Sequence, residues 1–320
     1  MPVIDAGCIV RVMSAAIRLA LVGIGKIARD QHVPALAANP AFELVAAASP
    51  HHQLDGVRHF ADLESLLAAL PEVEAVSICT PPQVRYDIAR DALLHGRHVM
   101  LEKPPGATLN EVSALVDLAQ ERGVALFAAW HSREAVAVEL ARKWLAERQI
   151  RNVSVMWKED VRVWHPGQHW IWRAGGLGVF DPGINALSIL TRILSDAVVL
   201  EEASLSFPSN CETPIAATLR LKSGGAPVRM ELDFLQTGPQ SWDIEVETDG
   251  GRLQLSGGGR VMRIDGKLVL EGQDNEYANL YARFETLVRE RRSDVDLAPF
   301  RLVADAFLCG RRVTVAPFIE

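Results

Sequence analysis

The sequence predicts a two-domain α/β protein: a doubly wound parallel sheet, followed by an α+β domain with a large, open and mainly antiparallel sheet. Three observations predict it. A glycine-rich turn follows the first apolar run, and apolar runs then alternate with helix-like segments as far as residue 129. Beyond residue 150 there are instead short segments of alternating polarity, separated by polar or glycine-rich turns. Strand–helix alternation is typical of parallel sheets, whereas period-two strands favour sheets with one solvated face.

Composition narrows the class of protein. The 320 residues are 49% hydrophobic and 23% charged, which is ordinary globular composition at a length typical of two domains. The net charge of -7 argues against nucleic acid and anionic membranes as partners. No apolar run reaches the roughly 18 residues that span a membrane, and residues 1–12 lack the features of a signal peptide. We therefore expect a cytoplasmic protein, with residues 1–14 disordered or ahead of the true start.

The first strand, residues 17–22, leads directly into Gly23-Ile24-Gly25-Lys26-Ile27-Ala28 and a helix-like segment, 29–38. This is G-x-G-x-x-A in the strand–turn–helix context that dinucleotide binding requires. Gly23 makes the tight turn, Gly25 lets the backbone approach a pyrophosphate, and Ala28 permits close packing of helix on strand. We expect Gly23, Gly25, Lys26 and Ile27 to contact NAD or NADP at the helix N-terminus.

The second strand, residues 42–48, ends in Ser49-Pro50-His51-His52, where NAD-binding chains normally carry a carboxylate for the ribose hydroxyls. Without that carboxylate a 2′-phosphate is not repelled, and Ser49 can donate a hydrogen bond to it. The turn itself contains no arginine to clamp the phosphate. A turn without any role in binding explains Ser49 and Pro50 equally well, so the choice between the two cofactors stays open.

The alternation then continues with helices at 62–70, 84–94 and 109–122 and strands at 75–79, 98–101 and 125–129. The loops Thr80-Pro81-Pro82 and Glu102-Lys103-Pro104 follow neighbouring strands. We therefore expect both loops on the same rim as the glycine turn, where ligands bind in such sheets. The prolines stiffen the loop that carries Lys103, which can act there as acid, base or electrostatic clamp. The alternative is a solvated lysine in a proline-rich turn.

The second half begins with a connecting helix, 134–149. Six alternating segments then predict the second sheet: 153–157, 203–207, 215–221, 227–234, 244–248 and 252–255. Residues 278–291 and 300–312 look helical. We place the domains at 15–132, 133–298 and 299–320.

Residues 157–172 hold four of the seven tryptophans, together with His165 and His169. Indole rings pack on the apolar faces of sugars, and their N–H groups donate to hydroxyls, so we expect Trp164 and His165 to touch substrate. An aromatic cluster that fixes a long loop is the alternative, and it explains some of these residues. Neither the histidines nor the four scattered cysteines have the spacing of a metal site.

Asp181 and Asn185 are four residues apart, on a helix expected to start near Pro182. Both side chains then point to the same side. The alternative for Asp181 is a helix-capping residue.

The motifs G-I-G-K-I-A, T-P-P and E-K-P, with Gly175–Asn185, resemble the glucose–fructose oxidoreductase / inositol dehydrogenase family. Residues 99–108, 157–162 and 164–168 most resemble its bacterial aldose 1-dehydrogenases, which act on L-arabinose or D-galactose. The resemblance implies NAD(P)-dependent oxidation of an aldopyranose at C1 to a lactone. It also implies a homodimer through the second sheet, and a last helix packed on the first domain. The alternatives are another dehydrogenase of this family and a non-catalytic sugar or dinucleotide sensor.

The resemblance also implies a site. Lys103 and Asp181 would hold O1 and take its proton, and the remaining contacts to cofactor and substrate would come from Thr80, Pro81, Pro82, Glu102, His131, Glu159, Trp164, His165, Asn185 and Trp242. Asn185 stands where the family usually has a histidine base. Because asparagine cannot serve as a base, the proton acceptor is Lys103 or Asp181, and the sequence leaves both open.

Overall fold

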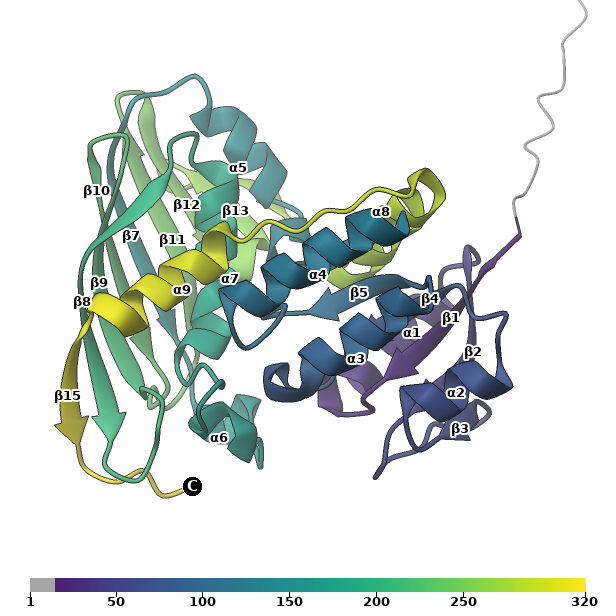
Figure 1. Ribbon diagram of the computed structural model, residues 1–320. Helices are drawn as coiled ribbons and strands as arrows, with labels where there is room; N and C mark the ends of the chain where they lie inside the picture. The colour runs from purple at the N-terminus through teal and green to yellow at the C-terminus, as the bar shows by residue number, and fades with distance from the viewer. Residues whose placement is uncertain (1–14) are drawn as a thin grey trace, which may run out of the picture.

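The computed structural model describes residues 15–320, so the expectation for residues 1–14 lies outside the described residues. Two sheets lie side by side, with helices on both faces of the first and between the two (Figure 1). The first sheet is parallel, in the order β3-β2-β1-β4-β5-β6, and the second is mixed, in the order β14-β13-β12-β11-β7-β10-β9-β8-β15. The predicted fold class is confirmed.

The first sheet follows the apolar runs. Its strands are β1 (Ile17–Val22), β2 (Phe42–Ala48), β3 (Arg58–Phe60), β4 (Ala75–Ile78), β5 (His98–Glu102) and β6 (Leu126–Ala129). Its helices are a π-helical turn (Ala28–His32), α1 (Val33–Ala37), α2 (Leu63–Ala69), α3 (Pro82–Leu94) and α4 (Leu109–Arg122). The short β3 was not predicted, and α3 begins at Pro82 rather than at 84 because proline is favoured in a first helical turn.

The strands of the second sheet are β7 (Ile150–Lys158), β8 (Val198–Pro208), β9 (Ala216–Ser223), β10 (Ala226–Asp233), β11 (Ser241–Thr248), β12 (Gly251–Ser256), β13 (Val261–Ile264), β14 (Lys267–Glu271) and β15 (Arg311–Val315). The second sheet contains all six predicted strands, four of them longer at one or both ends and two, β9 and β10, shifted by one or two residues. Two pairs, β7 with β10 and β8 with β15, run parallel, and the others are antiparallel. The last three strands were missed. The predicted helix 300–312 ends at Cys309, and the chain continues as β15.

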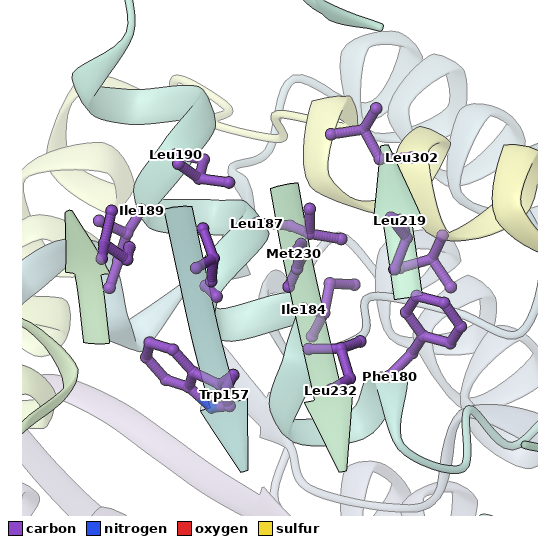
Figure 2. Close-up of a cluster of buried hydrophobic side chains, with 14 of the residues drawn as sticks. Trp157, Phe180, Ile184, Leu187, Ile189, Leu190, Leu219, Met230, Leu232 and Leu302 are labelled. Carbon is purple, nitrogen blue, oxygen red and sulfur yellow. The ribbon is translucent and has the colours of Figure 1, made fainter. Parts of the chain in front are cut away.

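The inner face of the second sheet is covered by α7 (Phe180–Ile193). Its apolar side chains, among them Ile184 and Leu187, pack against Met230 and Leu232 of β10 (Figure 2). The predicted helix 134–149 is shorter and divided into a 3-10 turn (His131–Glu134) and α5 (Val138–Leu145). The remaining helical turns are α6 (Val161–Trp164), His169–Trp172 and Gly257–Gly259.

The two last helices are placed differently from the expectation. α8 (Glu276–Glu290) is the helix that returns to the first sheet, since Tyr277, Tyr281 and Phe284 share a buried cluster with Phe42 of β2. α9 (Ala298–Cys309) lies mainly on α7 and β8, with a smaller contact to α4 (Figure 1). This corrects the expectation for 299–320, because both helices are amphipathic and the sequence does not say which sheet each one covers. None of the helices within residues 15–320 has the length and apolarity to cross a membrane.

Candidate active site

Lys103 and Asp181, 78 residues apart in the chain, meet between the two sheets. The Lys103 Nζ lies 3.0 Å from the Asp181 Oδ2 and donates to the Asp181 carbonyl oxygen, also at 3.0 Å. Their side chains are 13% and 3% exposed. The Asp181 Oδ1 is buried and has no hydrogen-bond partner within residues 15–320. An ion pair with one vacant carboxylate oxygen is suited to receive a hydroxyl group.

The position of Asp181 is set by α7. A Cβ atom at Gly183 would lie 2.6 Å from a methyl group of Leu232, so glycine is needed there for α7 to lie directly on β10. The residue that caps α7 is Val179, and the Asp181 carboxylate binds Lys103 instead of a backbone amide. The capping interpretation of Asp181 was therefore wrong.

His165 follows α6 and lies between two carboxylates. Its Nε2 is 3.0 Å from the Glu159 Oε1, and its Nδ1 is 3.7 Å from the Asp181 Oδ2. Glu159 is 2% exposed, and its Oε2 accepts a hydrogen bond of 2.8 Å from the Trp242 Nε1. The geometry thus places His165, Glu159 and Trp242 in one hydrogen-bonded group beside the Lys103–Asp181 pair.

The aromatic segment divides between site and core. Trp164 is 38% exposed and packs on Trp242, with ring centroids 4.8 Å apart. Trp157 is buried beneath Trp242, opposite it on β7. Trp172 packs on Phe234, while the side chain of His169 is 79% exposed. The interpretation as an aromatic cluster is therefore confirmed for Trp157 and Trp172. Trp164 is exposed and next to His165 in the chain, and its contact with substrate stays a prediction.

Asn185 and His131 have different surroundings. Asn185 is half-buried one helical turn after Asp181 on α7. His131 pairs with Glu276 of α8 and stacks on Tyr277 at 5.5 Å. Burial alone would lower the pKa of His131, but the charge and hydrogen bond of Glu276, together with the charge of Glu102, outweigh burial and raise it. Within residues 15–320, none of the groups of His, Cys, Asp and Glu is arranged to hold a metal ion.

Glu102 faces inward from the end of β5. Its Oε1 accepts from the His32 Nε2 at 2.9 Å and from the Tyr277 hydroxyl at 2.6 Å, while its Oε2 accepts from the Lys103 backbone N–H at 2.9 Å. Burial alone would raise the pKa of Glu102, but the hydrogen bonds and charge of His32 and the Tyr277 hydroxyl lower it to about 2. Glu102 therefore remains an anion beneath the rim and fixes the backbone of Lys103.

Arg85 of α3 is a residue that sequence analysis missed. It is 2% exposed and donates to the carbonyl oxygens of Thr80, Glu102 and Pro104. Burial lowers its pKa to about 10, so it stays charged at neutral pH. Arg85 thus joins the two rim loops. The signal in the sequence is weak, because an arginine one turn into a helix is usually exposed.

The glycine turn fits a dinucleotide. Gly23 has φ +88°, and a Cβ there would lie 2.8 Å from the Thr80 backbone nitrogen, so the protein itself requires this glycine. Gly25 is exposed, and apart from the local backbone no described atom lies within 4 Å of a Cβ built there. The Thr80 Oγ1 is buried and lacks a hydrogen-bond partner within the described chain. Open space over Gly25, and an unused hydroxyl on Thr80 next to Gly23, are what a bound pyrophosphate and its sugar would use.

An arginine from another part of the chain lies beside the turn that follows β2. Ser49 is buried and donates its N–H to the Phe60 carbonyl, whereas Pro50, His51 and His52 are exposed. Arg29, on the helix after the glycine turn, donates from Nη2 to the Gln53 carbonyl at 3.0 Å. Lys26, three residues before Arg29, is exposed and pairs with Asp30.

The two glycines are expected to respond differently to alanine. Gly25→Ala should raise the KM for the dinucleotide by about tenfold or more, because the methyl group occupies the space of the pyrophosphate. Its melting temperature should stay near that of the wild type. Gly23→Ala should lower the stability by at least about 1–2 kcal/mol, from its positive φ alone. Calorimetry and steady-state kinetics on both variants check this, and an unchanged KM in Gly25→Ala would contradict the placement of the pyrophosphate.

Comparison with known proteins agrees with this geometry. Residues 17–130 match the model of the Gfo/Idh/MocA oxidoreductase family, with its NAD-binding Rossmann fold. The chain is 46% identical over 305 residues to galactose 1-dehydrogenase of Pseudomonas fluorescens, covering 95% of this chain and 99% of that protein. A crystal structure of D-galactose-1-dehydrogenase protein from Rhizobium etli superposes with a TM-score of 0.91 at 53% identity, over 96% of this chain and 99% of that one.

A more distant structure shows the same fold. KijD10, a 3-ketoreductase from Actinomadura kijaniata solved with NADP, has a TM-score of 0.82 at 19% identity and covers 94% of this chain and 99% of its own. The chain therefore belongs to the Gfo/Idh/MocA family of NAD-binding oxidoreductases and is a dehydrogenase of CH–OH groups.

Proposed function

We propose that this protein oxidises D-galactose and L-arabinose at C1 to the corresponding lactones, with NAD or NADP as acceptor. The observation that carries the proposal is the Asp181 carboxylate, which is held by Lys103 through Oδ2 and keeps a buried, unused Oδ1. The names of the two relatives with high identity support galactose as a substrate. L-Arabinose follows from shared stereochemistry, since it has the same ring configuration at C2, C3 and C4.

The chemistry needs a proton acceptor at O1 and a hydride acceptor at C1. A bound nicotinamide supplies the hydride acceptor. Asp181 takes the O1 proton on its free Oδ1, and the ammonium group of Lys103 stabilises the charge that develops on O1. The C1–H bond breaks as the C1=O bond of the lactone forms. This choice of Asp181 over Lys103 rests on the geometry, since the Lys103 Nζ already contacts the Asp181 Oδ2 and carbonyl oxygen, whereas the Asp181 Oδ1 has no partner within residues 15–320.

The other hydroxyls would be bound by the neighbouring polar groups. His165 has a buried Nδ1 with no hydrogen-bond partner within residues 15–320, and Asn185 lies one turn beyond Asp181. The exposed ring of Trp164 offers a face for the apolar side of the pyranose. A site that hydrogen-bonds hydroxyls rejects an epimer strongly, because the wrong epimer leaves buried polar groups unpaired.

We expect D-galactose and L-arabinose both to be good substrates. D-Glucose, the C4 epimer of galactose, should have a kcat/KM lower by about tenfold or more, and D-xylose should fare equally badly. Absorbance of the reduced nicotinamide, with the lactone trapped by hydroxylamine, measures all four sugars. Equal kcat/KM for galactose and glucose would show that the protein does not recognise the C4 hydroxyl. Tight sugar or dinucleotide binding without turnover of any aldose would favour a sensor.

We also propose that both NAD and NADP are accepted. Within the turn 49–53 the sequence has no carboxylate to exclude a 2′-phosphate, and Arg29 reaches the same turn from the helix. Arg29 can therefore bind the 2′-phosphate although it lies outside the turn in the sequence.

Two variants test the cofactor site. Pro50→Arg should raise the ratio of kcat/KM for NADP to that for NAD by about tenfold or more, since charge-assisted hydrogen bonds contribute about 1.5–3 kcal/mol. Arg29→Gln should lower the same ratio and leave the kcat/KM for NAD nearly unchanged. If both variants kept the wild-type ratio, the 2′-phosphate would not lie at this turn.

A further inference from the structure

We propose that Phe318 and Glu320 position the substrate site from a distance, by holding the loop of residues 165–172, here called the site loop. The proposal rests on the function proposed above, because its kinetic readout is sugar binding. In Figure 1 the marked end of the chain lies close to α6, which begins the stretch that carries His165. The contacts of this end differ from those of a tail lying loosely on the surface.

Asn210 holds the backbone of Phe318 in both directions. Its Oδ1 accepts from the Phe318 N–H at 2.9 Å, and its Nδ2 donates to the Phe318 carbonyl at 2.7 Å. The Ser209 N–H also donates to the carbonyl of Val315, the last residue of β15. These hydrogen bonds hold the backbone of Phe318 against the loop that follows β8. The orientation of the Phe318 side chain is therefore fixed.

Ring contacts lead from Phe318 to the site. Its ring packs on Trp172, with centroids 5.0 Å apart, and Trp172 packs edge-on against Phe234 at 5.7 Å. Phe234, which is fully buried, packs in turn on the imidazole of His165 at 5.5 Å. Packed rings interdigitate and leave little free volume. A displacement of Trp172 therefore also displaces Phe234 and, through it, the imidazole of His165.

Glu320 holds the other side of the site loop. Its Oε1 accepts from the Gly167 N–H at 2.8 Å, and its Oε2 lies 3.8 Å from the His169 Nδ1. Gly167 is two residues after His165 and has φ +68°, at the point where the chain turns. Further along, the loop is anchored by its own domain, through Thr213 Oγ1 to the Ile171 carbonyl. Glu320 therefore anchors the end of the loop nearest to His165.

The first test is hydrogen exchange of the site loop, which needs no substrate. Phe318→Ala and Glu320→Ala should each speed the exchange of amides in 165–172 by about threefold to tenfold, the scale of losing one such contact. Ile319→Ala is the matched control, because the Ile319 side chain between them is 80% exposed, and it should exchange like the wild type. Unchanged exchange in both test variants would overturn the proposal.

The second test separates positioning from general loss of structure. Phe318→Ala and Glu320→Ala should raise the KM for D-galactose by about threefold to tenfold. The KM for the dinucleotide and the melting temperature should stay close to wild type. Phe318→Tyr keeps the ring, and Glu320→Gln keeps an oxygen for the Gly167 N–H, so both should restore the wild-type KM.

The two tests fail in different ways. If the wild type oxidises no aldose, the proposed function falls, while hydrogen exchange still decides whether Phe318 and Glu320 hold the site loop. If the wild type oxidises galactose but both alanine variants keep its KM, these residues do not position the substrate site.

Discussion

Lys103→Met lowers kcat for D-galactose by at least about a hundredfold, the usual scale for losing an acid–base or electrostatic group. Methionine keeps the unbranched side chain as far as Cε but removes the charged Nζ that lies 3.0 Å from the Asp181 Oδ2. The dissociation constant for the dinucleotide, measured in the absence of sugar, should change little, because Glu102 still holds the backbone N–H of residue 103. Turnover is thus lost without loss of cofactor binding.

A second variant controls for stability. Removing one partner of a buried ion pair leaves Asp181 uncompensated, which destabilises by about 3–5 kcal/mol. Lys103→Arg keeps the charge and should stay folded, but its longer planar group displaces O1, so its kcat should still fall clearly. A folded Lys103→Met protein with near-normal kcat would contradict the role assigned to Lys103.

Glu102→Gln destabilises the protein by about 3–5 kcal/mol at neutral pH, because it leaves His32 charged, buried and without its carboxylate partner. Both side chains are almost completely buried, at 1% and 3% exposed. The His32 pKa is raised well above its usual value, since Cys79, Tyr281 and Glu102 together outweigh the burial that would lower it. Chemical denaturation measures the loss, with Glu147→Gln, an exposed site, as the matched control.

The pH dependence of this loss has a fixed sign. The Glu102 pKa is lowered from the model-peptide value of 4.5 to about 2 in the folded state. The contribution of the ionised Glu102 to the free energy of unfolding is therefore complete above pH 4.5 and is lost as the pH falls through about 2. The difference in unfolding free energy between wild type and Glu102→Gln should narrow as the pH falls below 4.5. A difference that grows in acid, or is absent at neutral pH, would show that Glu102 is not a buried anion.

The sequence was sufficient for the five longer strands of the first sheet because they are largely apolar runs, whereas the short β3 was missed. It was less informative where charge is buried. Arg85 and Glu102 belong to residue types that are mostly exposed, and histidine is of intermediate burial. Nothing local in the sequence therefore indicates that these two residues and His32 meet beneath the rim. Long-range placement was the other limit, because amphipathic helices such as α8 and α9 do not encode which sheet they cover.

The candidate site shows the same division. The loop that carries Lys103 was located from strand and proline signals, whereas its contact with Asp181 depends on how α7 lies on β10. The role of Asp181 was ambiguous, because a carboxylate near a helix start can equally well be a cap. Phe318 gave no functional signal, since its contacts with Asn210 and Trp172 join segments far apart in the chain.

Transfer of deuterium from D-[1-²H]galactose tests the central claim most directly. If C1 is the carbon oxidised between Asp181 and the nicotinamide, mass spectrometry should find one deuterium in each reduced nicotinamide, and the lactone should carry none at C1. The same sugar labelled at C3 should give unlabelled reduced cofactor. Unlabelled cofactor from the C1-labelled sugar, or labelled cofactor from the C3-labelled one, would contradict oxidation at C1.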